Sequence, residues 1–135
     1  MYLSKLSEKQ KNLFLELAYQ LALIDNDYSE KEKIMIKSYC DEMGMEVPAA
    51  VRAASIDEII SAMNSGCMAL EKKIIVFEML GLAMVDGNYD ESEREILAEI
   101  MRVFEVGEDF ARESEKLLDE YIGMQNRMNT LVLGS

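Results

Sequence analysis

Two short acidic segments hold the oxygen atoms that could bind a cation in this chain. Residues 25–32 read DNDYSEKE and residues 86–93 read DGNYDESE. Carboxylate and amide oxygens are the ligands that Ca²⁺ and Mg²⁺ prefer in proteins. The candidate metal ligands are the oxygen-bearing side chains of these segments: Asp25, Asp27, Glu32, Asp86, Asn88, Asp90 and Glu93. The candidate cofactor is therefore a divalent cation, Ca²⁺ or Mg²⁺.

The two segments repeat each other at a spacing of 61 residues. Residues 21–32 and 82–93 are identical at six of twelve positions. In the first copy these are Leu21, Ala22, Asp25, Tyr28, Glu30 and Glu32. Each copy follows one helical stretch and precedes another, so the sequence predicts a duplicated helix-loop-helix. In one hypothesis the two acidic loops come together and share a cation.

Neither segment is an EF-hand. An EF-hand loop supplies ligands at positions 1, 3, 5, 7, 9 and 12, with glycine at position 6. Counting from Asp86, Glu91 occupies the glycine position and Leu97 stands where the bidentate glutamate belongs. Counting from Asp25 fails at the same two positions.

Helix capping is the alternative explanation of these residues. Ser29 with Glu32, and Asp90 with Glu93, have the spacing of capping boxes, which stabilise a helix start by about 1 kcal/mol each. Capping does not require the aspartate that begins both segments. Carboxylates that lie close together raise each other's pKa unless a cation or proton intervenes, so a clustered site would be stabilised by metal. Both explanations stay open.

Tyr28 and Tyr89 form a matched aromatic pair within the two segments. They could be functional, or each could pack its ring under its loop and keep its hydroxyl in water. The packing role is expected.

The elements that must position these segments are helices. The chain has 135 residues, half of them apolar, with one proline and seven glycines, which favours one all-α domain. Periodicity and capping signals predict seven helices, at residues 8–24, 30–42, 48–51, 55–64, 68–85, 91–104 and 109–130. Repeat one then covers residues 8–46, repeat two covers residues 68–107, and the C-terminal helix covers residues 109–130.

The apolar residues indicate which helix faces are buried. In the helix at residues 30–42 we expect five inward side chains: Ile34, Met35, Tyr39, Cys40 and Met43. The helix at residues 68–85 is apolar on most sides and should be central, with Gly81 allowing a neighbouring helix to come close. Gly44 and Gly107 are expected to end helices, and Asn64 to Gly66 to break the fourth.

Composition excludes several classes of function. The net charge of −12 opposes binding to nucleic acid or to an anionic membrane surface. The absence of histidine removes the commonest general base and every Ser-His or Cys-His nucleophile pair. No phosphate-binding glycine loop is present. An enzyme would need two carboxylates acting as acid and base, and nothing else in the chain supports one.

The sequence also bears on location. The most apolar stretch, residues 74–85, is twelve residues long, whereas a membrane-spanning helix needs about 20. Residues 1–11 lack the apolar run of a secretory signal, so we expect a cytoplasmic protein without a transmembrane segment. Cys40 and Cys67 stand 27 residues apart and are expected to be buried and unpaired.

The C-terminal helix and the methionines suggest a contact surface. An apolar stripe, formed by Phe110, Leu117, Leu118, Tyr121, Met124, Met128 and Leu131, could pack on the core or on a protein partner that the sequence does not identify. Eleven methionines suit an adaptable core, and exposure of Met124, Met128 and Leu131 would instead indicate an adaptable surface. The acidic residues from Glu105 to Glu120 could face a basic partner or only solvent.

The duplicated segments carry a family resemblance. Residues 83–93 resemble the A-x-x-D-G-x-[IVY]-x-x-x-E run of the tellurite-resistance TerB family, and of the related domain that precedes J domains in some co-chaperones. Residues 21–32 are a weaker copy, with Asn26 in place of the glycine matched by Gly87. The likeness covers residues 8–130. Without histidine the chain cannot contain the His-Pro-Asp of a J domain, so it would be a stand-alone module.

The resemblance implies a fold and a site. The fold would be a bundle of about seven helices with pseudo-two-fold symmetry. The site would be an acidic face where a divalent cation is proposed to bind, carried over to Asp25, Glu32, Asp86 and Glu93. The expected function is a non-enzymatic helical binding module, acting in stress response or as an adaptor. The alternative is a protein interaction module in which the acidic motifs serve only as helix caps.

Overall fold

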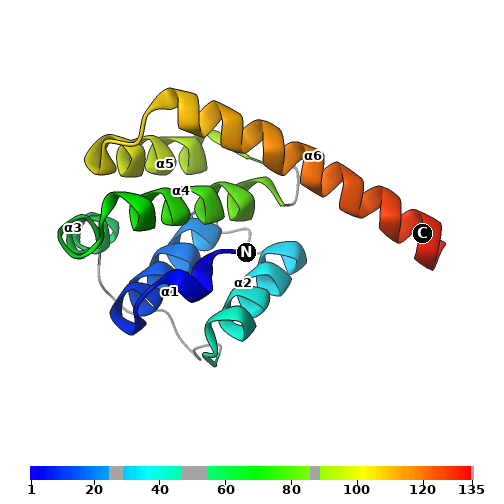
Figure 1. The fold of residues 1–135 in the computed structure, drawn as a ribbon, viewed down its shortest axis with the longest axis horizontal. Coiled ribbons are helices and arrows are strands. Elements are labelled where there is room, and N and C mark those ends of the chain that lie inside the picture. Colours follow the sequence, from blue (N-terminus) through cyan, green and yellow to red (C-terminus); the bar gives the residue numbers. More distant parts are fainter. Residues whose placement is uncertain (25–28, 47–54, 86–88, 135) are drawn as a thin grey trace.

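The computed structural model describes residues 1–24, 29–46, 55–85 and 89–134 (Figure 1). Every regular element in these residues is a helix, which confirms the all-α prediction. A 3₁₀ turn, η1 (Leu3–Lys5), precedes α1 (Glu8–Leu23), α2 (Glu30–Met43), α3 (Ile56–Gly66), α4 (Ala69–Met84), α5 (Glu91–Phe104) and α6 (Glu108–Leu133). The described part thus holds six of the seven predicted helices. The short helix predicted at residues 48–51 lies outside it.

Helix α4 lies in the middle of the fold, with α1 and α2 on one side and α5 and α6 on the other (Figure 1). It packs on α1, α5 and α6. Five of its large side chains are inaccessible to solvent: Ile75, Val76, Met79, Leu80 and Leu82. A helix that is apolar on most sides is stable only when neighbours cover it, so the central position predicted for this helix is confirmed.

Helices α1 and α3 complete the core beside α4. Helix α3 packs on both α1 and α5, and η1 packs on α2 and α4. Phe14 of α1 and Met63 of α3 are fully buried. The Phe14 ring meets the ring of Tyr39 edge to face, with 5.3 Å between their centroids. Such aromatic pairs add about 0.5–1.5 kcal/mol beyond the burial of their area.

Side-chain hydrogen bonds stabilise the starts of α1 and α3. At α1, Ser7 Oγ accepts from the backbone N–H of Gln10, and Gln10 Oε1 accepts from the N–H of Ser7. At α3, Ser55 Oγ accepts from the N–H of Glu58. These contacts satisfy backbone donors that have no partner within the first helical turn.

Two glycine predictions have different outcomes. Gly44 ends α2 with φ +71°, in the left-handed region that favours glycine, as predicted. The prediction that Gly107 ends α5 is wrong. Glu105 takes the left-handed position, with φ +56°, and the N–H of Val106 donates to the carbonyl of Met101 at 3.0 Å. Because Val106 packs on the core, the chain turns two residues earlier than the glycine suggests, and Gly107 starts α6 instead.

Two further expectations are corrected. Helix α3 continues through residues 64–66, where Ser65 Oγ donates to the carbonyl of Ser61 and Gln10 Nε2 donates to the carbonyl of Gly66. The side chain of Ile34 is 67% exposed, whereas Ile36 is fully buried. Helix α2 packs through the face that contains Ile36 and Tyr39, and this face leaves Ile34 in solvent.

The bounds of the helices repeat at a constant spacing. Helices α1 and α4 each have 16 residues, and α2 and α5 each have 14. The first and last residues of α4 and α5 lie 61 positions after those of α1 and α2. The left-handed residues Gly44 and Glu105 have the same spacing. A pseudo-two-fold relation between the two helix pairs stays a prediction.

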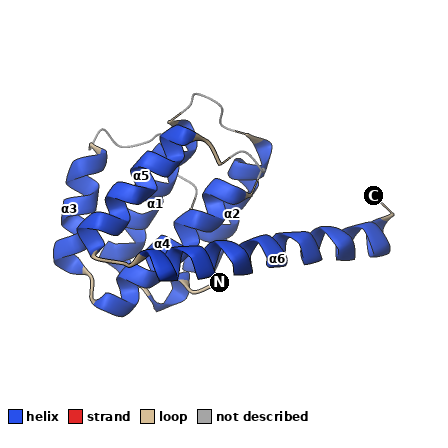
Figure 2. Cartoon of the chain, turned by 90° about the horizontal axis from the view of Figure 1, so that it is seen from above, coloured by secondary structure: helices blue, strands red, loops and turns tan. Residues whose placement is uncertain are grey.

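Helix α6 is the longest element and extends beyond the rest of the fold. Its N-terminal half packs on α4, and its C-terminal half projects away from the other helices (Figures 1 and 2). Ala111 and Leu118 are buried, whereas the large apolar residues from Met124 onward are exposed. The predicted helix of residues 109–130 is thus observed, and its outer half does not fill the core.

The cysteines and the question of membrane spans can be settled for the described part. Cys40 and Cys67 are both buried and free, as predicted. Burial raises the pKa of both thiols, with smaller contributions from nearby Asp41 and Glu71. Among the described residues, no helix has both the length and the apolar character needed to cross a membrane.

Candidate functional site

Three of the seven predicted metal ligands lie in the described part of the chain. They are Glu32 in the first turn of α2, Asp90 at the start of α5, and Glu93 in the first turn of α5. The other four, Asp25, Asp27, Asp86 and Asn88, lie outside the described residues.

The two glutamates occupy equivalent places in their helices. Glu32 forms the predicted capping box, since its N–H donates to Ser29 Oγ and its Oε1 accepts from the Ser29 N–H, both at 3.1 Å. The N–H of Glu93 donates to Asp90 Oδ1 at 2.9 Å. The capping box expected at Ser29 and Glu32 is therefore present, whereas at Asp90 and Glu93 the structure shows the half in which the Asp90 side chain caps the helix.

Burial distinguishes these two carboxylates from ordinary caps. Glu32 is 5% exposed and Glu93 is 4% exposed. A glutamate can cap a helix equally well at the surface, because it contacts the start of its own helix. Glu32 and Glu93 are thus buried carboxylates at equivalent places in two helices.

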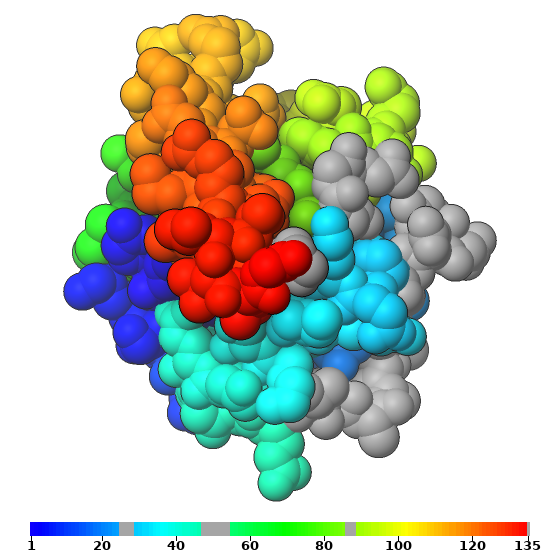
Figure 3. Space-filling model, turned by 90° about the vertical axis from the view of Figure 1, so that its right-hand side faces the viewer, coloured from blue at the N-terminus to red at the C-terminus, as the bar shows by residue number. Residues whose placement is uncertain are grey.

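The segments that begin α2 and α5 share one face of the molecule. Figure 3 shows this face, with the start of α2 in light blue and the start of α5 in yellow-green. Helix N-termini carry a partial positive charge, which favours acidic side chains in both first turns. Within the described residues, no three acidic or cysteine side chains form a group able to hold a metal ion. That finding does not extend to the four predicted ligands outside them.

Tyr89 lies beside this face and has a packing role. Its ring is half-buried against the core, and the Arg94 guanidinium stacks over it at 4.0 Å from the centroid. Arg94 Nε also donates to the Tyr89 carbonyl at 3.2 Å. Burial, and then the charge of Glu115, raises the pKa of Tyr89 to about 12. The phenol is therefore neutral at physiological pH, and its partner Tyr28 lies outside the described residues.

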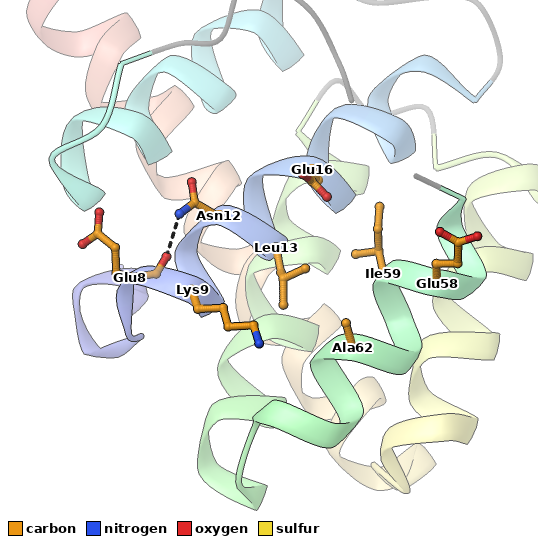
Figure 4. A pocket seen from close by; sticks show the side chains of 8 residues that line it. All are labelled: Glu8, Lys9, Asn12, Leu13, Glu16, Glu58, Ile59 and Ala62. Carbon is orange, nitrogen blue, oxygen red and sulfur yellow. Dashed lines mark hydrogen bonds between the residues drawn. The ribbon is translucent and has the colours of Figure 1, made fainter. Parts of the chain in front are cut away.

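A surface groove of about 740 Å³ lies between α1 and α3 (Figure 4). Leu13, Ile59 and Ala62 form its apolar part, and Glu8, Lys9, Asn12, Glu16 and Glu58 supply its polar groups. Asn12 Nδ2 donates to the carbonyl of Glu8, a contact within the helix itself.

A smaller cavity of about 240 Å³ lies between α2, α4 and α6. The amino group of Met1 reaches this cavity and contacts Glu42 Oε1 at 2.8 Å and Glu78 Oε1 at 2.9 Å. Burial alone lowers the pKa of this amine, but the hydrogen bonds and charges of Glu42 and Glu78 outweigh burial and raise it. Tyr39 donates from its hydroxyl to the Glu78 carbonyl at 2.8 Å.

Sequence reasoning missed the role of Glu78. This residue is buried, and its Oε1 also accepts from the backbone N–H of Tyr2 at 2.9 Å. One carboxylate within the apolar run at residues 74–85 is a signal that a positive partner exists. The partner is 77 positions away, which helical periodicity does not reveal.

The exposed apolar surface of α6 is the second candidate site. We call it the α6 stripe and define it by five residues that follow one another along one side of the helix. They are Leu117, Tyr121, Met124, Met128 and Leu131, with exposed fractions of 51%, 48%, 53%, 52% and 85%.

Comparison of this chain with protein families, with characterised proteins and with solved structures finds no significant match.

Proposed function

We propose that this protein is a non-enzymatic helical binding module that contacts a protein partner through the α6 stripe. The exposure of five large apolar side chains in a row on one helix is the observation that carries this proposal. Contiguous apolar surface of this kind is uncommon on monomeric proteins and marks interaction sites. Amphipathic helices that present such a face are a recurring mode of recognition.

The chemistry of the stripe suits a protein contact. Met124 and Met128 lie at its centre, and their flexible, polarisable side chains adapt to different partner surfaces. Tyr121 adds an aromatic ring, a type enriched where interfaces concentrate their binding energy. Glu113 and Glu120 stand beside the inner half of the stripe and form part of its rim. These features support the alternative raised from the sequence, namely contact through the C-terminal helix.

The absence of enzyme chemistry is part of the same proposal. The chain has no histidine, and both cysteine thiols are buried with raised pKa values, which disfavours the reactive thiolate. The groove between α1 and α3 presents three carboxylates and Lys9 on an open surface. A general acid and base need environments that separate their pKa values.

The TerB-like classification belongs to this proposal too. It is supported by the constant spacing of 61 residues between the bounds of α1 with α2 and of α4 with α5. Equal helix lengths and matching left-handed caps are what a duplicated helix pair would retain.

Affinity capture with two charge-matched variants tests the interaction. Immobilised wild type should retain a protein from a lysate of the source cells in the presence of EDTA. The double variant Met124→Asp/Met128→Asp should lose it. The control Asn126→Asp/Thr130→Asp adds the same charge at the same spacing on the opposite side of α6 and should retain it. Equal capture by all three proteins contradicts the proposal.

Divalent-cation binding is a second candidate, favoured by the equivalent positions of Glu32 and Glu93 in the first turns of α2 and α5. Acidic oxygen ligands suit Ca²⁺ or Mg²⁺, and the segments before both helices hold further aspartates. Isothermal titration of wild type and of Asp86→Ala with each cation tests it. Binding heat and a raised melting temperature in wild type alone would support the site. No heat and no shift in either protein would leave helix caps as the whole explanation.

A further inference from the structure

We infer that the partner of the α6 stripe is a second copy of this chain, bound through the same stripe in antiparallel orientation. This inference rests on the proposed function of the stripe and adds the identity of the partner. It is carried by the spacing of the stripe residues, by the distribution of charge along the chain, and by the shape of the fold around α6.

The spacing of the stripe is that of a helix-pairing seam. Leu117, Tyr121, Met124, Met128 and Leu131 follow at steps of four, three, four and three residues. This repeat of 3.5 residues keeps side chains on one line and allows them to interlock with those of a facing helix.

The seam is distinct from the face that α6 presents to its own core. Ala111, Ser114 and Leu118 are buried on that face. At about 100° per residue the stripe lies about a quarter-turn around the helix from Leu118. Helix α6 therefore has two apolar faces, one covered by α4 and one exposed.

The charge along the chain favours contact at this end of the molecule. Residues 121–134 contain Arg127 as their one charged residue. Since the whole chain carries −12, the remainder carries −13. Two copies that meet elsewhere bring acidic surfaces together, which is unfavourable. The outer half of α6 is nearly uncharged and projects away from the acidic body (Figures 1 and 2).

Charge also decides between parallel and antiparallel pairing. A parallel pair would place the two acidic bodies side by side at one end of the helix pair, which is unfavourable. An antiparallel pair centred between Met124 and Met128 places the two bodies at opposite ends of the helix pair.

The cavity between α2, α4 and α6 can receive the end of the second helix. Tyr121, Ile122 and Gln125 line this cavity where α6 leaves the body. The antiparallel pair is centred between Met124 and Met128, and Tyr121 and Leu131 each lie five residues, or about 7.5 Å, from this centre. Leu131 of the second copy therefore faces Tyr121. The most exposed side chains, those of Leu131, Val132 and Leu133, then lie near a concave surface.

The area of this contact suits a weak dimer. Five side chains, most of them about half exposed, cover less than the roughly 800 Å² per copy of a standard interface, so we expect a micromolar dissociation constant.

Analytical ultracentrifugation of the full chain from 1 μM to 1 mM tests the inference. Wild type and the control Asn126→Asp/Thr130→Asp should change from monomer to dimer over this range. Met124→Asp/Met128→Asp should weaken the dimer at least a hundredfold while its circular dichroism stays that of the folded wild type. A monomeric wild type at 1 mM, or a dimer that survives the double substitution, would overturn the inference.

Disulfide trapping determines the orientation. An oxidised mixture of Met124→Cys and Met128→Cys chains should give the mixed dimer as its main product, because these positions face each other in an antiparallel pair. Predominant linkage of each variant to itself would contradict the antiparallel arrangement. If wild type stays monomeric yet loses a captured partner on Met124→Asp/Met128→Asp substitution, self-pairing is wrong while the proposed interaction function stands. If wild type stays monomeric and the capture experiment also shows no dependence on the stripe, both the self-pairing and the proposed interaction function are wrong.

Discussion

The left-handed turn at Glu105 allows a quantitative test of the fold, through the substitution Glu105→Gly. Glu105 has φ +56° and ψ +37° and closes α5, and its side chain is exposed. The equivalent position 61 residues earlier is Gly44, with φ +71° and ψ +33°. Glycine adopts this conformation without steric conflict, whereas a residue with a side chain is strained in it.

The expected gain follows from three contributions, of which two favour the folded state and one opposes it. Relief of the left-handed conformation favours the folded state by about 1–2 kcal/mol. The greater freedom of glycine in the unfolded chain opposes this by about 0.4–1 kcal/mol. Removing a negative charge from a helix C-terminus adds about 0.3 kcal/mol. Glu105→Gly should therefore raise the free energy of unfolding by about 1 kcal/mol.

Urea unfolding at pH 7, followed by circular dichroism, measures this change. Glu105→Gln is the matched control, since it removes the charge and keeps a side chain in the left-handed position. It should gain only about 0.3 kcal/mol. Gly44→Ala should lose about 1 kcal/mol, because it adds a side chain at the same kind of turn. A Glu105→Gly protein no more stable than Glu105→Gln would refute the reasoning.

Three further predictions concern α4, the amino terminus and α6. Gly81→Ala should raise the free energy of unfolding by about 0.5–1 kcal/mol in urea, because the added Cβ would sit at an ordinary 3.5 Å from Leu118 Cδ2. Folding raises the pKa of the Met1 amine. Its contribution to the free energy of unfolding is therefore full below the unfolded pKa of 8.0 and is lost as pH rises through the raised pKa of the folded state. The melting temperature should thus fall between pH 8 and pH 10, with a smaller fall in Glu78→Gln, and parallel falls in both proteins would contradict this. At 1 μM, the Met124→Asp/Met128→Asp pair should change the free energy of unfolding by less than about 1 kcal/mol, whereas Leu118→Asp should cost more than about 3 kcal/mol. Similar losses would mean that the stripe is packed within the monomer.

Local chemistry made the helix starts predictable. A serine hydroxyl three residues before a free backbone N–H is a contact made within a few residues of sequence, so the cap at Ser29 could be identified directly. The central place of α4 was predictable for a similar reason. Its apolar side chains surround the helix, and no other position would bury them.

Predictions that depended on distant contacts were less successful. Gly107 was a reasonable helix end, but the packing of Val106 fixed the turn at Glu105 instead. Ile34 fits the apolar period of α2, and only the angle at which the helix meets its neighbours leaves it exposed. The contact between Glu78 and the Met1 amine joins groups 77 positions apart. Helix periodicity contains no information about such pairs.

The candidate sites also combine local features, which the sequence shows, with features that depend on distant contacts. The acidic segments were found from their repetition, and the described part shows their capping contacts at Ser29 and Asp90. The unusual burial of Glu32 and Glu93 depends on tertiary packing. For α6, the apolar stripe was evident in the sequence. A stripe that faces a core and a stripe that faces solvent have the same pattern, so only the structure could show that Met124 and Met128 are exposed.

Site-specific photo-crosslinking in the source cells tests the central claim most directly. A photoreactive phenylalanine at Met128 lies on the α6 stripe, and the same group at Asn126 lies on the opposite side of the helix. Illumination should give a discrete covalent adduct from position 128 and none from position 126, and mass spectrometry should identify the adduct as a second copy of this chain. Adducts from neither position, or equally from both, would contradict the claim that the stripe is a binding surface.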